Sequence, residues 1–338
     1  MTKILVLSTL AASLVMGSSL LKEAKEAGLV AIPKNMKEVR KLVDNPNNPI
    51  TDAKVELGKK LFFEPRISKS GLISCNTCHN LATGGVDGVA AAIGHKWTAN
   101  PHHLNSPTVY NAVFFDAQFW DGRDPDLEKQ AQGPILAAPE MAATKEHVVS
   151  TVRSMPEYVK SFEEAYGKGV KIDYETITAT IGLFERTLVT PAPYDSYLNG
   201  DKNAMSQDQK AGLKTFIDKG CATCHTGVAL GGSMQAFEVT GKYKYADIGD
   251  FKGDKNGLVK VPTLRNINET APYFHNGAVS TLKEAIVEMG RIQLGVKITD
   301  KEASSIESFF KALEGRKPLI VYPQLPNPTS STPKPDVN

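Results

Sequence analysis

The sequence predicts a mostly α-helical protein of about two domains. Apolar residues recur at helical spacing in several segments, for example at Ile177, Ile181, Phe184 and Leu188. No run of alternating apolar and polar residues is sustained enough to indicate a large β-sheet. A length of 338 residues is typical of about two domains.

Five segments carry the helical pattern. They span residues 143–162, 173–188, 206–219, 281–289 and 300–313. Ser206 stands three residues before Gln209, a spacing that predicts a capping box at the start of the third helix. The glycine-rich stretch 227–257 shows little periodicity and is expected to form a long loop.

A proline pair marks the expected domain boundary. Thr190-Pro-Ala-Pro193 interrupts the helical pattern, because proline disfavours helix at the residue before it. We therefore expect an N-terminal domain over residues 20–190 and a C-terminal domain over residues 191–316. The tail, residues 317–338, is rich in proline. Its part 319–325 is apolar enough to pack on a neighbouring surface, and the last part, from Asn327 onward, should be extended or disordered.

The N-terminus has the pattern of a secretory signal. Lys3 precedes an apolar run from Ile4 to Met16, and small residues follow at 17–19. We expect residues 1–19 to be the signal, with an uncertain cut, and the mature protein to be periplasmic. An uncleaved anchor and an ordinary buried helix are the alternatives.

The formal net charge is only +2. This value gives no support for nucleic-acid binding, and any docking surface must therefore be local.

All four cysteines of the chain lie in two copies of one pentapeptide. The copies are Cys75-Asn-Thr-Cys78-His79 and Cys221-Ala-Thr-Cys224-His225. Cys-x-x-Cys-His is the attachment motif of c-type haem. Both thiols lie on one face of a helical turn, so they can reach the two vinyl groups of one porphyrin, and the histidine gives the iron an axial nitrogen. The sequence therefore predicts two haem c groups.

Other uses of these cysteines explain less of the pattern. A zinc site, a thioredoxin-like redox pair or two structural disulfides would each employ closely spaced cysteines. None of them accounts for a histidine directly after both pairs.

The ligand on the far side of each iron decides between electron transfer and catalysis. Residue chemistry alone leaves several candidates open. The candidate ligands are Met289 and the histidines outside the two motifs, which are His95, His102, His103, His147 and His275.

Several further segments resemble the bacterial dihaem cytochrome c peroxidases. The resemblance runs in order from about Ile32 to Gly315. The matching segments are LGKKLFF at 57–63, SCNTCHN at 74–80, GHKW at 94–97, NSPT at 105–108, QFWDGR at 118–123 and PYFHNG at 272–277. The resemblance implies two cytochrome c-like domains, each with one covalent haem, a homodimer, and calcium between the domains.

The resemblance also implies a role for each haem. The N-terminal haem would be the low-potential, peroxidatic centre, with His79 proximal and His95 distal in the resting enzyme. Because His102 and His103 follow closely, they compete with His95 for that distal position. The C-terminal haem would be the high-potential centre that accepts electrons, with His225 proximal. Its distal ligand would be Met289, and methionine ligation raises a haem's potential.

The family's catalytic and calcium positions carry over as well. Glu140 matches the distal glutamate that moves a proton during cleavage of the peroxide bond, and Gln130 matches a glutamine of the same pocket. His95 and Glu140 would exclude one another at the iron, so activation would require the loops to rearrange. Trp120 matches a tryptophan between the haems, although it could equally be a core aromatic. The matching calcium ligands are the side chain of Asn105 and the carbonyls of Thr270 and Pro272.

The expected activity is reduction of hydrogen peroxide to water, with electrons from a small c-type cytochrome or copper protein. Two rivals remain. A related dihaem oxidase acting on a partner protein would carry tyrosine where this chain has Met289. A dihaem electron carrier would have no use for Glu140 and Gln130.

Overall fold

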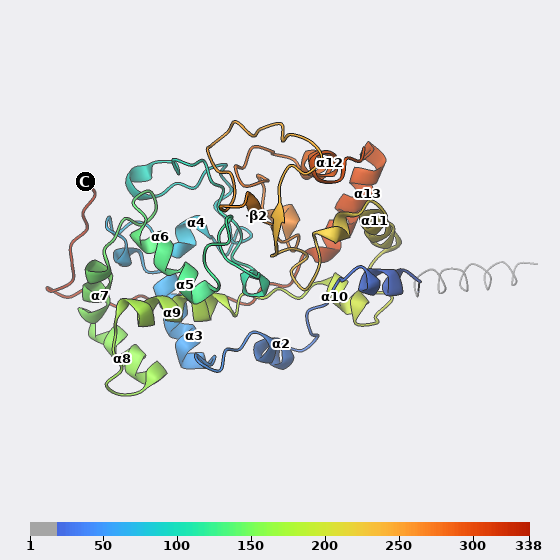
Figure 1. Ribbon diagram of the computed structural model, residues 1–338. Coiled ribbons are helices and arrows are strands. Elements are labelled where there is room, and N and C mark those ends of the chain that lie inside the picture. The colour runs from blue at the N-terminus through green and yellow to red at the C-terminus, as the bar shows by residue number, and fades with distance from the viewer. Residues whose placement is uncertain (1–18) are drawn as a thin grey trace, which may run out of the picture.

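The computed structural model describes residues 19–338, and these are mostly helical with one small sheet. The helices form two groups (Figure 1). One group contains the Cys75 motif and the other contains the Cys221 motif. The prediction of a mostly α-helical chain is confirmed.

The first group is built around the pair α3 and α9. Its helices are α2 (Met36–Leu42), α3 (Asp52–Phe62), α4 (Cys75–Cys78), α5 (Leu127–Gln130), α6 (Gln132–Leu136), α7 (Lys145–Arg153), α8 (Pro156–Tyr166) and α9 (Tyr174–Glu185). Side-chain oxygens cap several of these helices. Thr51, Thr144 and Asp173 each accept a backbone N–H of the first turn, which satisfies donors that the helix itself leaves unpaired.

The helix predicted over residues 143–162 is two helices in the structure. α7 ends at Arg153 and α8 begins at Pro156. Proline lacks the N–H that a continuous helix would need at this position and fits the first turn of a new helix. The prediction of one helix was therefore wrong at Pro156, and the apolar pattern continues across the break because both helices face the same core.

The second group contains α10 (Pro193–Leu198), α11 (Gln207–Asp218), α12 (Leu282–Met289) and α13 (Asp300–Phe310). The capping box predicted between Ser206 and Gln209 is present in both directions, at 3.2 and 2.8 Å. The helices predicted over 173–188, 206–219, 281–289 and 300–313 are confirmed to within a few residues at each end.

A two-stranded antiparallel sheet accompanies the second group. Strand β1 (Met234–Ala236) pairs with β2 (Leu258–Lys260), so that Met234 lies opposite Lys260. Strand β1 lies inside the stretch 227–257 that was predicted as loop, and most of that stretch is irregular.

Both groups use a glycine where two helices cross. In the first group, a Cβ on Gly58 of α3 would clash with the Thr180 carbonyl of α9. In the second group, a Cβ on Gly212 of α11 would clash with the Ser305 carbonyl of α13. In each group the Cys-x-x-Cys-His motif comes after the helix that carries this glycine. The close crossing therefore fixes the helix that leads toward the motif.

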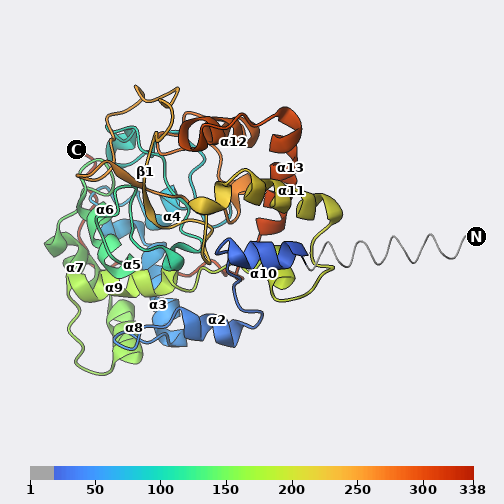
Figure 2. The ribbon, with the colours of Figure 1, turned by 45° about the vertical axis from the view of Figure 1, so that its right-hand side comes forward.

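Each end of the described chain packs against the group of helices that is more distant in the sequence: the N-terminal end on the second group and the C-terminal tail on the first. Leu20, Ala24 and Leu29 pack in the core of the second group, beside α10 and α11 (Figure 2). The tail runs back to the first group, where Ile320 and Leu325 pack on the core and Tyr322 packs edge-on against Phe63, with ring centroids 4.9 Å apart. The predicted packing of residues 319–325 is therefore confirmed for part of the segment, although Leu319 itself is exposed.

Farther along, the tail is extended but attached. The Thr329 hydroxyl donates to the Ser154 carbonyl at 2.9 Å, and the Asp336 N–H donates to the Lys69 carbonyl at 2.9 Å.

Within residues 19–338, no helix is long and apolar enough to cross a membrane. The predicted signal lies almost wholly outside the described residues.

Replacing Gly212 by Ala tests the crossing of α11 and α13. Replacing a glycine in the interior of a helix by alanine usually makes the protein more stable. Here the new methyl group would overlap the α13 backbone, so we expect a net loss of about 1–3 kcal/mol and a lower melting temperature by circular dichroism. The exposed neighbour Ala211→Gly serves as the control and should lose only about 1 kcal/mol, through helix propensity. A rise in melting temperature for Gly212→Ala would contradict the crossing.

Candidate active site

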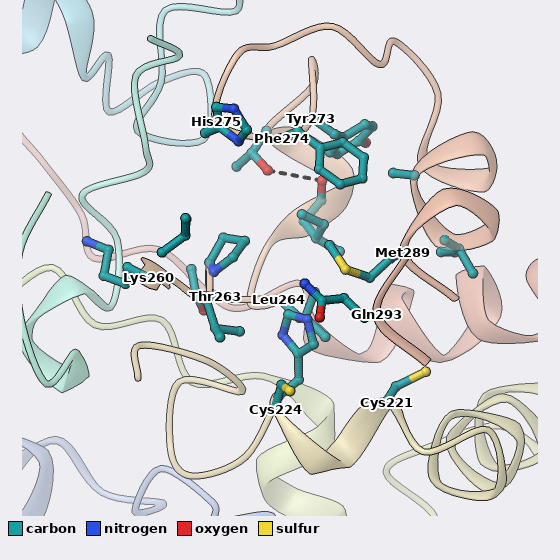
Figure 3. A pocket seen from close by; sticks show the side chains of 18 of the residues that line it. Cys221, Cys224, Lys260, Thr263, Leu264, Tyr273, Phe274, His275, Met289 and Gln293 are labelled. Atoms are coloured by element: carbon teal, nitrogen blue, oxygen red, sulfur yellow. Dashed lines mark hydrogen bonds between the residues drawn. The ribbon is translucent and has the colours of Figure 1, made fainter. Parts of the chain in front are cut away.

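The C-terminal motif opens into a large apolar cavity. Cys221, Cys224, His225 and Met289 all line it, and Figure 3 shows the labelled Met289 and the cysteines around the same space. The motif begins at a sharp turn, because Gly220 ends α11 with a positive φ of 84° that suits glycine. Met289 is the last residue of α12 and precedes a π-turn at Gly290–Leu294.

His225 is held as a neutral ring. It is 9% exposed, and burial lowers its pKa. Its Nδ1 lies 3.0 Å from the Leu230 carbonyl. Nδ1 therefore carries the proton and donates it to that carbonyl, which leaves Nε2 with a lone pair suited to a metal ion.

The N-terminal motif forms a single helical turn. Ser74 and Thr77 form a capping box around α4, and the Ser74 N–H donates to the Thr77 hydroxyl at 3.0 Å. His79 follows at the C-terminal end, and burial lowers its pKa although Asp87 opposes the shift. Its Nδ1 is buried and has no hydrogen-bond partner among the described residues.

The four cysteines are unpaired in the structure. Burial raises the pKa of Cys78 to about 12 and that of Cys221 to about 11, so both thiols are protonated at neutral pH.

His95 is the buried histidine of its loop. It is 7% exposed, and its Nδ1 has no partner among the described residues. The loop lies against the N-terminal motif, because the Cys78 thiol is 3.7 Å from the carbonyl of Ile93. Positive φ angles at Lys96 and Trp97 turn the chain sharply after His95.

His102 and His103 face the second group instead. The His102 Nδ1 lies 2.9 Å from the Asp250 carboxylate, and this side chain is 58% exposed. The His103 Nδ1 lies 3.2 Å from the Asn276 carbonyl. Of the three histidines, His95 is thus the one that is buried near the first motif.

The Glu140 segment contacts the His95 segment directly. The His95 N–H donates to the Glu140 carbonyl at 2.7 Å. Gly94 packs so closely on the backbone of Pro139 and Glu140 that a Cβ would not fit. Burial raises the pKa of the Glu140 carboxyl, and Arg123 partly opposes this shift. The Glu140 carboxylate is near enough to the first motif that its charge helps to raise the pKa of the Cys78 thiol. Gln130, the last residue of α5, is half-buried.

Trp120 lies between the two groups. It is 9% exposed, its Nε1–H donates to the Asn105 carbonyl at 2.9 Å, and it lines the C-terminal cavity. Two of the predicted calcium ligands, Asn105 and Pro272, contact each other directly, because the Asn105 amide donates to the Pro272 carbonyl at 2.7 Å. That direct hydrogen bond leaves no room for an ion between these two atoms. The Thr270 N–H is bonded to Ile267 within a short helical turn.

Sequence reasoning missed one buried charge in the cavity wall. Lys260 is 3% exposed and ends strand β2. No sequence signal pointed to it, because lysine is usually exposed and the strand is too short for its alternation to be recognised.

Comparisons with known proteins identify the family. A family profile for di-haem cytochrome c peroxidase matches residues 52–203. The chain is 44% identical to the cytochrome c551 peroxidase of Pseudomonas aeruginosa, over 90% of this chain and 89% of that protein. It is 46% identical to the cytochrome c551 peroxidase of Nitrosomonas europaea, over 82% and 85% respectively.

The chain belongs to the di-haem cytochrome c peroxidase family. A solved structure of a MauG-like protein associated with microbial copper homeostasis superimposes with a TM-score of 0.70 at 27% identity, over 80% of this chain and 92% of that one. The enzyme is thus a cytochrome c peroxidase. A di-haem family implies two haems, and the two Cys-x-x-Cys-His motifs supply one attachment point each.

The residues present fit a haem in this peroxidase. An apolar cavity with two free thiols at one end and a neutral imidazole is what a covalent porphyrin requires. The N-terminal motif offers the same groups, because it has two free thiols and a buried His79 whose pKa is lowered by burial.

Exchanging single histidines of the 95–103 loop tests which one reaches the N-terminal haem. We expect His95→Ala to convert one low-spin haem of the oxidised protein to high-spin, because the buried side chain is removed. His102→Ala, the control, should leave the spectrum unchanged, since this ring is exposed and bonded to Asp250. Electron paramagnetic resonance and visible spectra measure both. The opposite pattern would assign the ligand to His102.

Proposed function

We propose that this peroxidase reduces hydrogen peroxide to water at the N-terminal haem. Electrons would come from a small soluble c-type cytochrome or a copper protein and would enter at the C-terminal haem. The observation that carries this proposal is the contact between His95 and Glu140 beside the Cys78 motif. A pure electron carrier has no need of a half-buried acid at this place.

In this proposal different residues would hold the two haem irons. His79 and His95 would hold the N-terminal iron in the resting state, while His225 and Met289 would hold the C-terminal iron. The cavity lined by both His225 and Met289 supports the second assignment. Methionine raises the potential relative to a second histidine, so electrons load the C-terminal haem first.

The protein's contribution to the chemistry is proton transfer. Each haem, when bound, supplies one of the two electrons that peroxide needs, and the N-terminal iron supplies the place where peroxide binds. Reduction of one peroxide to two waters consumes two electrons and two protons. Glu140 takes a proton from the near oxygen of peroxide and returns it to the leaving oxygen. Burial raises the pKa of its carboxyl, so it can accept and release this proton more readily than an exposed acid. Gln130, half-buried at the end of α5, would line the same pocket and orient the substrate.

Opening of the site follows from the same contact. His95 would occupy the position that peroxide needs, and its segment is bonded to the Glu140 segment. When His95 moves away, the contact of Gly94 with Pro139 and Glu140 must therefore break, or the Pro139–Glu140 segment must move together with His95. Activation is then a change between two packed arrangements rather than a side-chain rotation.

The proposal extends to electron transfer, calcium and assembly. Trp120 would lie on the path between the haems, and its buried position in the cavity wall supports a role in electron transfer. Calcium would bind at Asn105, Thr270 and Pro272 if the Asn105 amide turned its oxygen toward the ion and moved away from the Pro272 carbonyl. We propose that the two helix groups are two cytochrome c-like haem domains, residues 20–190 and 191–316, of a periplasmic homodimer whose signal is residues 1–19.

Replacing Glu140 by Gln tests the catalytic assignment. The amide keeps the shape but cannot accept a proton, so we expect peroxide-dependent oxidation of a reduced cytochrome c to fall about 10²- to 10⁴-fold. Haem content should not change. In the wild type, kcat/KM should fall as the pH drops through the Glu140 pKa, because the carboxyl must be ionised to act as a base. Burial raises that pKa, so the fall should occur above the ordinary value of 4.5.

The control is Glu146→Gln, because Glu146 is an exposed acid on α7. It should keep full activity. Full activity in Glu140→Gln would remove the proposed role. Absence of peroxidase activity in the wild type, with both haems low-spin before and after one-electron reduction, would favour the electron carrier.

A further inference from the structure

Lys260 is an unusual residue for the wall of an apolar cavity. Its backbone is fixed on two sides, because it pairs with Met234 across the sheet and its N–H donates to the Trp120 carbonyl at 2.8 Å. Its side chain is 3% exposed, and the ammonium lies over the Phe115 ring, 4.7 Å from the centroid. The ammonium is therefore buried where the two groups of helices meet.

This ammonium has no anionic partner within residues 19–338. No carboxylate lies within ion-pair distance of its Nζ. Asp121 acts on it favourably from farther away, but the Asp121 carboxylate is bonded to Arg123 at 2.8 Å, and Arg123 repels the ammonium. Burial of an unpaired charge is costly, and it lowers the pKa of Lys260 to about 7.

The cavity offers no other charged side chain. Among the described residues that line it, Lys260 is the only lysine or arginine, and none is aspartate or glutamate. In Figure 3, Lys260 lies on the side of the cavity opposite Met289, away from Cys221. A porphyrin attached to two cysteines through its vinyl edge presents two propionate carboxylates at its other edge. These carboxylates need a cation, and the cavity contains one.

We propose that the Lys260 ammonium binds a propionate of the haem c in this cavity and that its charge raises the reduction potential of that haem. The inference rests on the proposed function, which places the electron-accepting haem here. A fixed positive charge near the iron favours the reduced form, which carries one positive charge fewer. In a poorly solvated site this effect is large compared with that of a surface charge. Lys260 is thus a positioning residue that acts through the propionate.

The proposal has a definite pH dependence. Pairing with a propionate raises the pKa of Lys260 above the value of about 7 that burial alone gives it. When the pH rises through the pKa of the paired lysine, the positive charge is lost. The potential of the C-terminal haem therefore falls with rising pH. Asp121 and Arg123 are the charged side chains that act on this ammonium, and they oppose one another: Asp121 raises the pKa of Lys260 and Arg123 lowers it.

Spectroelectrochemical titration of the complete dihaem protein tests the proposal. The potential of the C-terminal haem is measured from about pH 6 to about pH 9, a range that includes the expected lysine titration. We expect Lys260→Met to lower that potential and to remove its pH dependence. The equilibrium constant for accepting an electron from a given donor should fall on the order of tenfold. The control Lys255→Met removes an exposed charge from the same loop and should change neither quantity.

Lys260→Arg keeps the test decisive if the methionine variant fails to fold. Arginine stays charged throughout this pH range. The variant should keep the high potential of the wild type at low pH and lose the decrease at high pH. A wild-type pH dependence in Lys260→Arg, or an unchanged potential in a fully loaded Lys260→Met protein, would overturn the proposal.

Failure of the proposed function would look different. Mass spectrometry and the pyridine haemochrome spectrum report how many haems are attached, and near-infrared spectra report methionine ligation. Loss of the second haem or of methionine ligation in the wild type would contradict the proposed function. If both haems are attached and substitution of Lys260 does not change the potential of the C-terminal haem, only this inference is contradicted.

Discussion

Desolvation is the physical constraint on which the site depends. The same apolar surroundings keep His79 and His225 neutral, favour a proton on Glu140 and leave Lys260 without water. Burial is the largest cause of the pKa shift in all four. Neutral imidazoles can bind a metal, a carboxyl with a raised pKa can exchange protons, and a lone ammonium attracts an anion. One property of the surroundings therefore prepares three kinds of chemistry.

Much of this arrangement could be predicted from local sequence. The haem motifs, the Ser206 capping box and most helices follow rules that act within one or two helical turns. The break at Pro156 was missed because the apolar pattern continues across it. The role of Lys260 was missed for a different reason. It depends on Trp120 and Phe115, far away in the sequence, and no local rule records which side chains fold together.

The histidines of one loop show how the fold resolves an ambiguity that the sequence leaves open. Residue type does not separate His95 from His102 and His103. Burial does, because His95 faces the first motif while the other two contact Asp250 and Asn276 of the second group. The loop therefore connects both halves of the molecule, and a shift in residues 245–251 would be felt at His95.

The crossing of the chain ends affects how the protein can be made. Leu20 and Leu29 belong to the core of the second group, whereas Ile320 and Leu325 cover the core of the first. A nascent chain cannot complete either core until residues near 320 have emerged, so neither half has a finished surface during synthesis. A chain that stops early or is clipped in the tail exposes apolar surface around Phe63. Because a large exposed apolar patch promotes association between molecules, we expect a truncated chain to aggregate more readily than the complete one.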